Sequence, residues 1–291
     1  MTQRLRETWL GTHPWLQPVA QVEEAVARAV KASVPAPLTP PDWESWGDDA
    51  ERGWPLLRSE VFAPLAATRL AECLGAAAAR LRAATEDPGD AASELPRALK
   101  DECARLDAWL STGPVARATA AQWVLSHGSP AEPPEPGIGA MLRLVGWTAT
   151  QRLMEGISES LGSAKAGDAA LWTHGHCPGC GALAATAQLV EVGGGRVRYL
   201  GCGLCGCTWR YRRVGCPHCG NEKPQKLEVL EVEGEPGLRL DTCHECRGYV
   251  KTDTRNGRQV LLRADWPTLH LDVLAAEWGW SRLGPALFEA T

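Results

Sequence analysis

The chain has 291 residues, a formal net charge of −5 and a hydrophobic fraction of 44%. This length suits about two domains, and the composition is sufficient for a packed core. Residues 1–170 carry 16 basic and 22 acidic side chains, and residues 171–291 carry 14 and 13, so neither half has the basic excess that favours binding to nucleic-acid phosphates.

Helical periodicity dominates the first 165 residues. Apolar side chains at helical spacing, interrupted by proline, predict helices over 21–34, 59–85, 91–110, 115–125 and 138–161. The stretch 35–54 is rich in Pro, Asp and Trp and predicts a loop. About five helices with short connections predict a helical bundle over residues 1–165.

The pattern changes after the small and polar segment 162–170, where we place the domain boundary. Apolar runs around turn residues predict three hairpins, with arms at 183–192 and 197–200, at 227–232 and 238–241, and at 249–253 and 259–262. Residues 208–214 alternate with period two and predict a strand, and residues 268–278 predict a short helix.

These elements predict an α+β multidomain fold. We expect a helical domain at 1–165, a first four-cysteine ribbon at 171–214, a second at 215–265, and a C-terminal helix and tail at 266–291. Each ribbon then has a CxxC pair, a hairpin, a second CxxC pair and a further strand.

Four CxxC pairs lie in the second half, as CPGCG at 177–181, CGLCG at 202–206, CPHCG at 216–220 and CHECR at 243–247. A CxxC turn followed by glycine forms a knuckle in which backbone N–H groups point at the first sulfur, and glycine tolerates the positive φ of that turn. The intervening loops of 21 and 23 residues are slightly longer than zinc-ribbon spacing.

Eight thiolates in this order predict two tetrahedral metal sites, since thiolates are soft, charged ligands that suit Zn²⁺ or a single Fe. Sequential pairing predicts one site at Cys177, Cys180, Cys202 and Cys205, and another at Cys216, Cys219, Cys243 and Cys246. Crossed pairing is the alternative, and it needs longer chain excursions. Metal binding should supply much of the folding free energy of ribbons this small.

The expected cellular compartment favours metal binding by the clustered cysteines over disulfide bonds. The N-terminus, MTQRLRETWL, lacks an apolar core followed by a small-residue cleavage site, and no run reaches the roughly 18–20 apolar residues of a membrane span. We therefore expect a cytoplasmic protein, in which clustered cysteines are metal ligands more often than disulfides. Thiol–disulfide chemistry is the competing interpretation, but such a motif normally occurs once, at the start of a helix.

Three cysteines lie outside the four pairs. Cys73 and Cys103 occupy helical stripes and are expected to pack as small hydrophobic residues. Cys207 follows Cys205 by two residues, so it could be a buried small residue, a spare ligand or a reactive thiol. Burial is the interpretation we favour.

Four histidines accompany the knuckles. His174 and His176 precede the first knuckle, and we expect them around the site or at the surface because four thiols already complete it. His218 and His244 lie inside knuckles, where the middle positions normally face solvent.

No catalytic motif accompanies the cysteines. The sequence has no G-x-S-x-G, H-E-x-x-H, P-loop or Rossmann glycine pattern. A metal ion held by four thiolates also has no open position for water or substrate. We therefore expect no enzymatic activity.

The motifs resemble the formate dehydrogenase accessory protein family, FdhE. The resemblance rests on CPGCG at 177–181, RYLGCGLC at 198–205 with Trp209 following, CPHCG at 216–220, DTCHEC at 241–246 and the closing LHLDVLAAE at 269–277. It implies a cytoplasmic, non-enzymatic assembly factor that binds the catalytic subunit of formate dehydrogenase. It also implies rubredoxin-like iron on the cysteines, with zinc as the alternative.

We expect the partner-binding surface near Trp209, Arg210, Arg212 and Arg213, because aromatic residues and arginine are enriched at protein interfaces. Self-association is compatible with the sequence. The functional alternatives are a metal-ribbon regulator that binds nucleic acid, since these residues interleave aromatic and cationic side chains, and a redox protein that works through iron or Cys207.

Overall fold

The chain forms two compact units in the computed structural model, which describes residues 3–41, 43, 46–127, 132–163, 172–255 and 265–287. The helical unit comprises 7–39 and 60–155, and the cysteine unit comprises 1–6, 40–59 and 156–291. The limits of these units differ from the predicted domain limits, because residues 40–59 and those from Gly156 onward belong to the unit that contains the cysteines. The predicted limits stay a prediction.

The helical unit is built around one long helix, α4 (Phe62–Glu86), which packs against α2 (Gln17–Ser33), α5 (Arg97–Leu110), α6 (Pro114–Leu125) and α7 (Gly139–Leu153). Leu70, Leu74 and Leu81 of α4 are buried at helical spacing and form its core face. Cys73 and Cys103 are buried in α4 and α5. The bundle predicted for this part of the chain is confirmed.

The predicted helix over 138–161 is two helices, α7 and α8 (Glu155–Ser163). The backbone leaves the helical region at Met154, where ψ is 2°. Glu155 then places a carboxylate in the first turn of α8, where the helix dipole favours it. The break coincides with the boundary between the two units.

Several short helices complete the described residues. They are α1 (Gln3–Thr12), α3 (Gly47–Glu51) inside the predicted loop, α9 (Leu269–Glu277), and the 3-10 turns η1 (Pro14–Leu16), η2 (Leu56–Arg58), η3 (Ala91–Glu94), η4 (Pro224–Lys226) and η6 (Trp266–Thr268). No helix within the described ranges is both long enough and apolar enough to cross a membrane.

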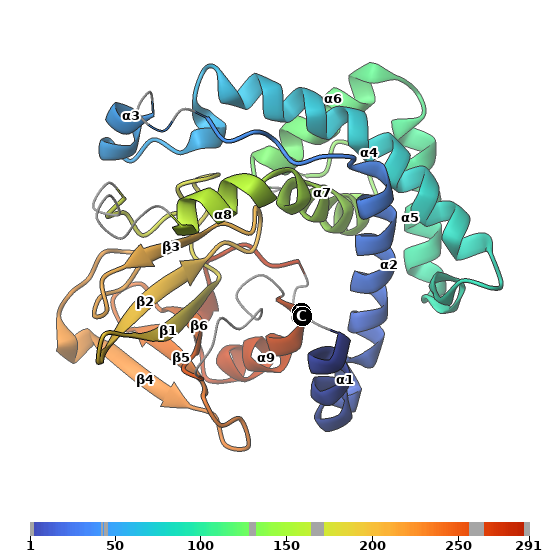
Figure 1. Ribbon diagram of the computed structural model, residues 1–291. Coiled ribbons are helices and arrows are strands. Elements are labelled where there is room, and N and C mark those ends of the chain that lie inside the picture. Colours follow the sequence, from blue (N-terminus) through green and yellow to red (C-terminus); the bar gives the residue numbers. More distant parts are fainter. Residues whose placement is uncertain are drawn as a thin grey trace. The chain divides into compact units, whose positions relative to one another are not determined.

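One sheet organises the cysteine unit (Figure 1). In the described part of the chain its strands are β1 (Thr186–Val192), β2 (Gly195–Gly201), β3 (Thr208–Tyr211), β4 (Leu227–Glu231), β5 (Leu238–Cys243), β6 (Gly248–Asp253) and β7 (Ser281–Arg282). Their order is β3-β2-β1-β6-β5-β4, with β7 beside β6. Each ribbon supplies three antiparallel strands, and the parallel pair β1–β6 joins the two ribbons.

The first two predicted hairpins are confirmed as β1–β2 and β4–β5. Gly193 and Gly194 turn the first hairpin with φ of 57° and 82°, the positive values that a tight two-residue turn requires. The third prediction is confirmed for its first arm, β6, whereas its turn and second arm at 256–262 lie outside the described residues. The strand predicted over 208–214 ends at Tyr211.

A buried ion network fixes α9 and β7 to the central strand β6. Lys251 Nζ lies 2.7 Å from both Asp265 Oδ1 and Asp272 Oδ2, and Arg282 contacts the same two oxygens at 2.9 and 2.7 Å. Tyr249 donates a 2.7 Å hydrogen bond to the other oxygen of Asp272. Two cations and two carboxylates balance, and their attraction holds the pKa of Asp265 at about 2 although burial alone would raise it.

We expect Lys251→Met to destabilise the protein by about 3–5 kcal/mol, because it leaves two buried carboxylates with one cation. The measurement is urea unfolding of the metal-loaded protein. Lys223→Met removes an exposed lysine and should change the free energy of unfolding by less than about 0.5 kcal/mol. Equal effects of the two substitutions would show that the network does not stabilise the fold.

Candidate metal centres

Each hairpin brings two CxxC knuckles together. The first knuckle precedes β1 and the second begins immediately after β2, and Thr186 pairs with Gly201 at the adjoining ends of these strands. In the second ribbon, the third knuckle precedes β4 and the fourth begins at Cys243, which pairs with Leu227. Cysteines that are more than 20 residues apart in the sequence therefore become neighbours.

The knuckles have the backbone conformation that the sequence predicts. Gly181, Gly206 and Gly220 have φ of 82°, 71° and 73°, and their amides donate to the carbonyl of the first cysteine of their knuckle at 2.8, 3.1 and 3.0 Å. The Cys205 amide also points at Cys202 Sγ, 3.5 Å away. In the fourth knuckle Arg247 adopts the same left-handed conformation, with φ of 58°.

The eight predicted cysteines form two groups of four. Within each group the Sγ atoms all lie within 4.8 Å of one another: Cys177, Cys180, Cys202 and Cys205 form the first group, and Cys216, Cys219, Cys243 and Cys246 the second. Sequential pairing is therefore confirmed over crossed pairing.

The sulfur distances fit a tetrahedral metal ion. In the first group Cys177–Cys205 and Cys180–Cys202 are 3.4 Å apart, and in the second Cys216–Cys246 and Cys219–Cys243 are 3.6 and 3.7 Å apart. Four sulfurs bound at roughly 2.3 Å from one ion would be separated by about 3.8 Å. A small contraction or expansion of each group would accommodate Zn²⁺ or Fe.

The protonation of the thiols links metal binding to pH. Burial raises the pKa of Cys180 and Cys205 well above the ordinary value. The pKa of Cys177 is lowered instead, because hydrogen bonds from the neighbouring thiols outweigh its burial. A metal ion must displace the remaining protons, so its affinity falls as the pH falls.

The surroundings of the two groups differ. Residues beside the first group close it: the Leu56 and Leu57 amides donate to the carbonyls of Pro178 and Gly179 at 2.9 and 2.8 Å, and Ser158 Oγ donates to Gly206 O at 3.0 Å. All four sulfur-bearing side chains of this group are at most 2% exposed. The sequence analysis did not predict that these residues enclose the first group. The one unusual feature of the segment 40–59 in the sequence is its content of tryptophan and proline.

The second group is open to solvent on one side. Cys219 is exposed and Cys246 is half-exposed, whereas Cys216 and Cys243 are buried. Backbone amides of Glu245 and Cys246 stabilise the thiolate of Cys243, so its pKa is lowered although burial opposes the shift. Asn221 Nδ2 lies 3.7 Å from the same sulfur.

The remaining predicted residues lie around the sites. Cys207 is fully buried beside the first group but is not one of its four thiols, as expected of a buried small residue. His176 Nε2 lies 3.0 Å from Gly53 O, and His174 packs beside it.

The two histidines inside the knuckles differ in their exposure. His244 is partly exposed, and its Nε2 lies 3.0 Å from Glu228 Oε2. His218 differs from the expectation of a solvent-facing ring, because it is half-buried and bonds Ala184 O at 2.9 Å.

The predicted partner-binding residues lie on and after β3. Trp209 is 4% exposed, and its Nε1 lies 3.3 Å from His174 O, so it belongs to the interior of the unit. Arg210, Arg212 and Arg213 are exposed. Arg212 pairs with Glu222 and lies over the ring of Tyr211. The role of this surface stays a prediction.

Comparisons with known proteins agree with the cysteine motifs. A protein named Protein FdhE homolog from Stutzerimonas stutzeri is 40% identical over 120 residues, and one of the same name from Pseudomonas aeruginosa is 37% identical over 122 residues. These matches span 39% of this chain and only 38% and 39% of the relatives' own length. No protein-family model matches the chain.

The fold is similar to that of a solved structure described as the crystal structure of the FdhE protein from Pseudomonas aeruginosa. The TM-score is 0.59 with 24% identity, and the match covers 92% of this chain and 88% of the other. The similarity to FdhE proteins predicted from the cysteine motifs is therefore confirmed in sequence, and the common fold extends through both units.

Purified protein is expected to contain two metal ions per chain, measured by elemental analysis, and ferric iron on four thiolates would colour it whereas zinc would not. Cys207→Ala should still bind two ions, because Cys207 is outside both groups of four. Cys180→Ser removes a thiol of the first group and should reduce the number of metal ions bound per chain. Loss of an ion from Cys207→Ala would contradict the assignment of ligands.

A competing chelator should remove metal in two phases, the faster from the second group because Cys219 and Cys246 are accessible. The release can be followed by an indicator dye or by loss of thiolate absorbance. Cys219→Ser should abolish the fast phase, and Cys73→Ala, a change within the helical unit, should retain both phases. A fast phase that persists in Cys219→Ser would contradict this order.

Proposed function

We propose that the chain is an accessory protein for the assembly of formate dehydrogenase. In this proposal it acts in the cytoplasm and binds the catalytic subunit of the enzyme. The observation that carries the proposal is the agreement of two features: a fold that matches an FdhE structure over both units, and eight cysteines arranged as two groups of four. Neither feature alone would distinguish an assembly factor from another metal-stapled protein.

The proposed metal ligands are the four thiols of each group. A bound ion would join two knuckles that are otherwise held by one hairpin, and so would stabilise the sheet and the loops after it. Resemblance favours iron, and zinc suits the same ligands. Because four thiolates leave no open coordination position, the proposed role is structural rather than enzymatic.

The proposed contact with the partner lies at Arg210, Arg212 and Arg213. These guanidinium groups are exposed on the edge strand β3 and the loop after it. Arg212 is already paired with Glu222, but both side chains are at least 40% exposed. Exposed pairs contribute little stability, so an acidic group of a partner could replace Glu222.

The test is capture of the catalytic subunit by the immobilised, metal-loaded chain. We expect the double variant Arg210→Glu and Arg212→Glu to weaken this binding about tenfold or more, because charge reversal creates repulsion where attraction existed. Affinity can be measured by surface plasmon resonance with the purified subunit. The matched control is Arg80→Glu with Arg97→Glu, two exposed arginines of the helical unit.

The outcomes test the proposed assembly function and the proposed contact surface separately. If the unmodified chain fails to bind the subunit and fails to restore formate dehydrogenase activity in cells that lack their own accessory protein, the proposed function is wrong. If it binds but the two double variants have equal affinity, the function stands and the contact surface lies elsewhere.

A further inference from the structure

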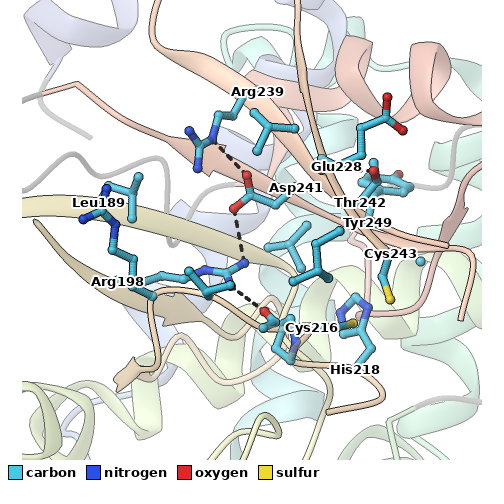
Figure 2. A pocket seen from close by; sticks show the side chains of 18 of the residues that line it. Leu189, Arg198, Cys216, His218, Glu228, Arg239, Asp241, Thr242, Cys243 and Tyr249 are labelled. Carbon is cyan, nitrogen blue, oxygen red and sulfur yellow. Dashed lines mark hydrogen bonds and ion pairs between the residues drawn. The ribbon is translucent and has the colours of Figure 1, made fainter. Parts of the chain in front are cut away.

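A cavity of about 220 Å³ lies between the two ribbons on one side of the sheet (Figure 2). Its walls come from β1 and β2 of the first ribbon, from β4, β5 and β6 of the second, and from the loop 213–218 that leads into the third knuckle. The cavity reaches Cys216 and Cys243, so it adjoins the second group of cysteines. Its other lining residues are not among the eight grouped cysteines, so the metal sites do not account for them.

The charges that line the cavity are unbalanced. Four arginines, Arg196, Arg198, Arg213 and Arg239, face two carboxylates, Glu228 and Asp241. Glu228 is already paired with His244 at 3.0 Å. The protein as a whole carries a net charge of −5, so this excess of positive charge is local.

Arg198 is the most deeply buried of these cations, since its side chain is 3% exposed. Figure 2 shows the contacts: its Nη1 donates to Gly215 O at 2.9 Å, and its Nη2 lies 3.3 Å from Asp241 Oδ2. Arg239 Nε approaches the other oxygen of Asp241 at 2.9 Å. One carboxylate is therefore shared between two guanidinium groups, and the next anionic group in the lining is the second cysteine group, through Cys216 and Cys243.

The Nε–H group of Arg198 strengthens this argument. It is buried, and among the described residues no atom accepts a hydrogen bond from it. Burying a charge or a donor without a partner is unfavourable, because its interactions with water are lost. The ion network around Lys251 has equal numbers of cations and carboxylates, whereas Arg198 and Arg239 share the single carboxylate of Asp241.

Arginines also line the mouth of the cavity. Arg196, Arg198 and Arg213 also line a neighbouring groove of about 490 Å³, together with Arg210 and Arg212. Arg196 forms an exposed and loose ion pair with Glu191, at 3.7 Å. Within the described residues no carboxylate pairs with Arg213, so an approaching anion would meet a cationic entrance.

We propose that this cavity binds an oxyanion, a carboxylate or phosphate group, whose oxygens accept hydrogen bonds from Arg198 and Arg239. Guanidinium groups present paired N–H donors that match these oxygens. The volume exceeds that of several water molecules, at about 30 Å³ each, and is sufficient for one such group. The group comes from a free small anion or from an acidic side chain of a bound peptide segment.

The experiment uses the full, metal-loaded chain, with calorimetric titrations at constant ionic strength and chloride as the reference salt. The probes are inorganic phosphate, a short polyglutamate peptide, and polyglutamine of the same length. We expect saturable binding of phosphate or polyglutamate and none of polyglutamine. Polyglutamate that binds and is displaced by phosphate identifies an acidic segment as the source, and phosphate that binds alone identifies a free anion.

Variants locate the bound anion. Arg239→Gln should weaken binding about tenfold or more, because it removes a charged donor. Asp241→Asn should tighten binding, because it removes the carboxylate that competes for both arginines, and a purely structural role of Asp241 would not produce this gain. Arg80→Gln is the matched control, since Arg80 is an exposed residue of the helical unit and lines neither the cavity nor the groove.

Two results would overturn the proposal: no saturable binding of phosphate or polyglutamate, or equal losses in Arg239→Gln and Arg80→Gln. Metal content and urea unfolding confirm that each variant is folded. The inference is independent of the proposed function. Its probes require no formate dehydrogenase, so the anion site and the assembly role can fail separately.

Discussion

The arrangement of the cysteine unit depends on one constraint: four sulfurs that are distant in the sequence must lie within a single tetrahedron. Cys177 and Cys205 are 28 residues apart, yet their sulfurs approach to 3.4 Å. A hairpin satisfies this requirement because its two ends meet at one edge of the sheet. The left-handed residue after each knuckle then turns the chain away from the sulfurs. The same construction occurs twice, and the two copies share one sheet.

The two copies have different surroundings, although their ligand sets are alike. The first group is enclosed by residues that precede it by more than a hundred positions, such as Leu56, and by Ser158 of α8. The second group has one open side and adjoins a cationic cavity. A buried four-thiol group suits a permanent staple, because solvent and competing ligands cannot reach it. An accessible one can respond to its surroundings, and the proposed anion site adjoins it.

Much of the fold and of the candidate sites was predictable from local patterns. Helical periodicity located the core helices around α4, and the glycines at 193–195 located the first hairpin. The spacing of the CxxC pairs predicted both groups of four, because a hairpin between paired knuckles leaves few other arrangements. The break at Met154 was missed, since periodicity continues through it. Trp209 was assigned to a surface, because alternation along a strand does not indicate which face is buried.

The sequence by itself therefore determined most of the core elements, which depend on local patterns, and the grouping of the eight cysteines, which depends on the spacing of the CxxC pairs around each hairpin. Only the tertiary structure decided how these parts combine: the parallel pairing of β1 with β6, the contacts of Leu56 and Leu57 with the first knuckle, and the meeting of Arg198 with Asp241 across the two ribbons. Such contacts join segments far apart in the sequence. Burial and charge balance there depend on the packed structure, and no local pattern encodes them.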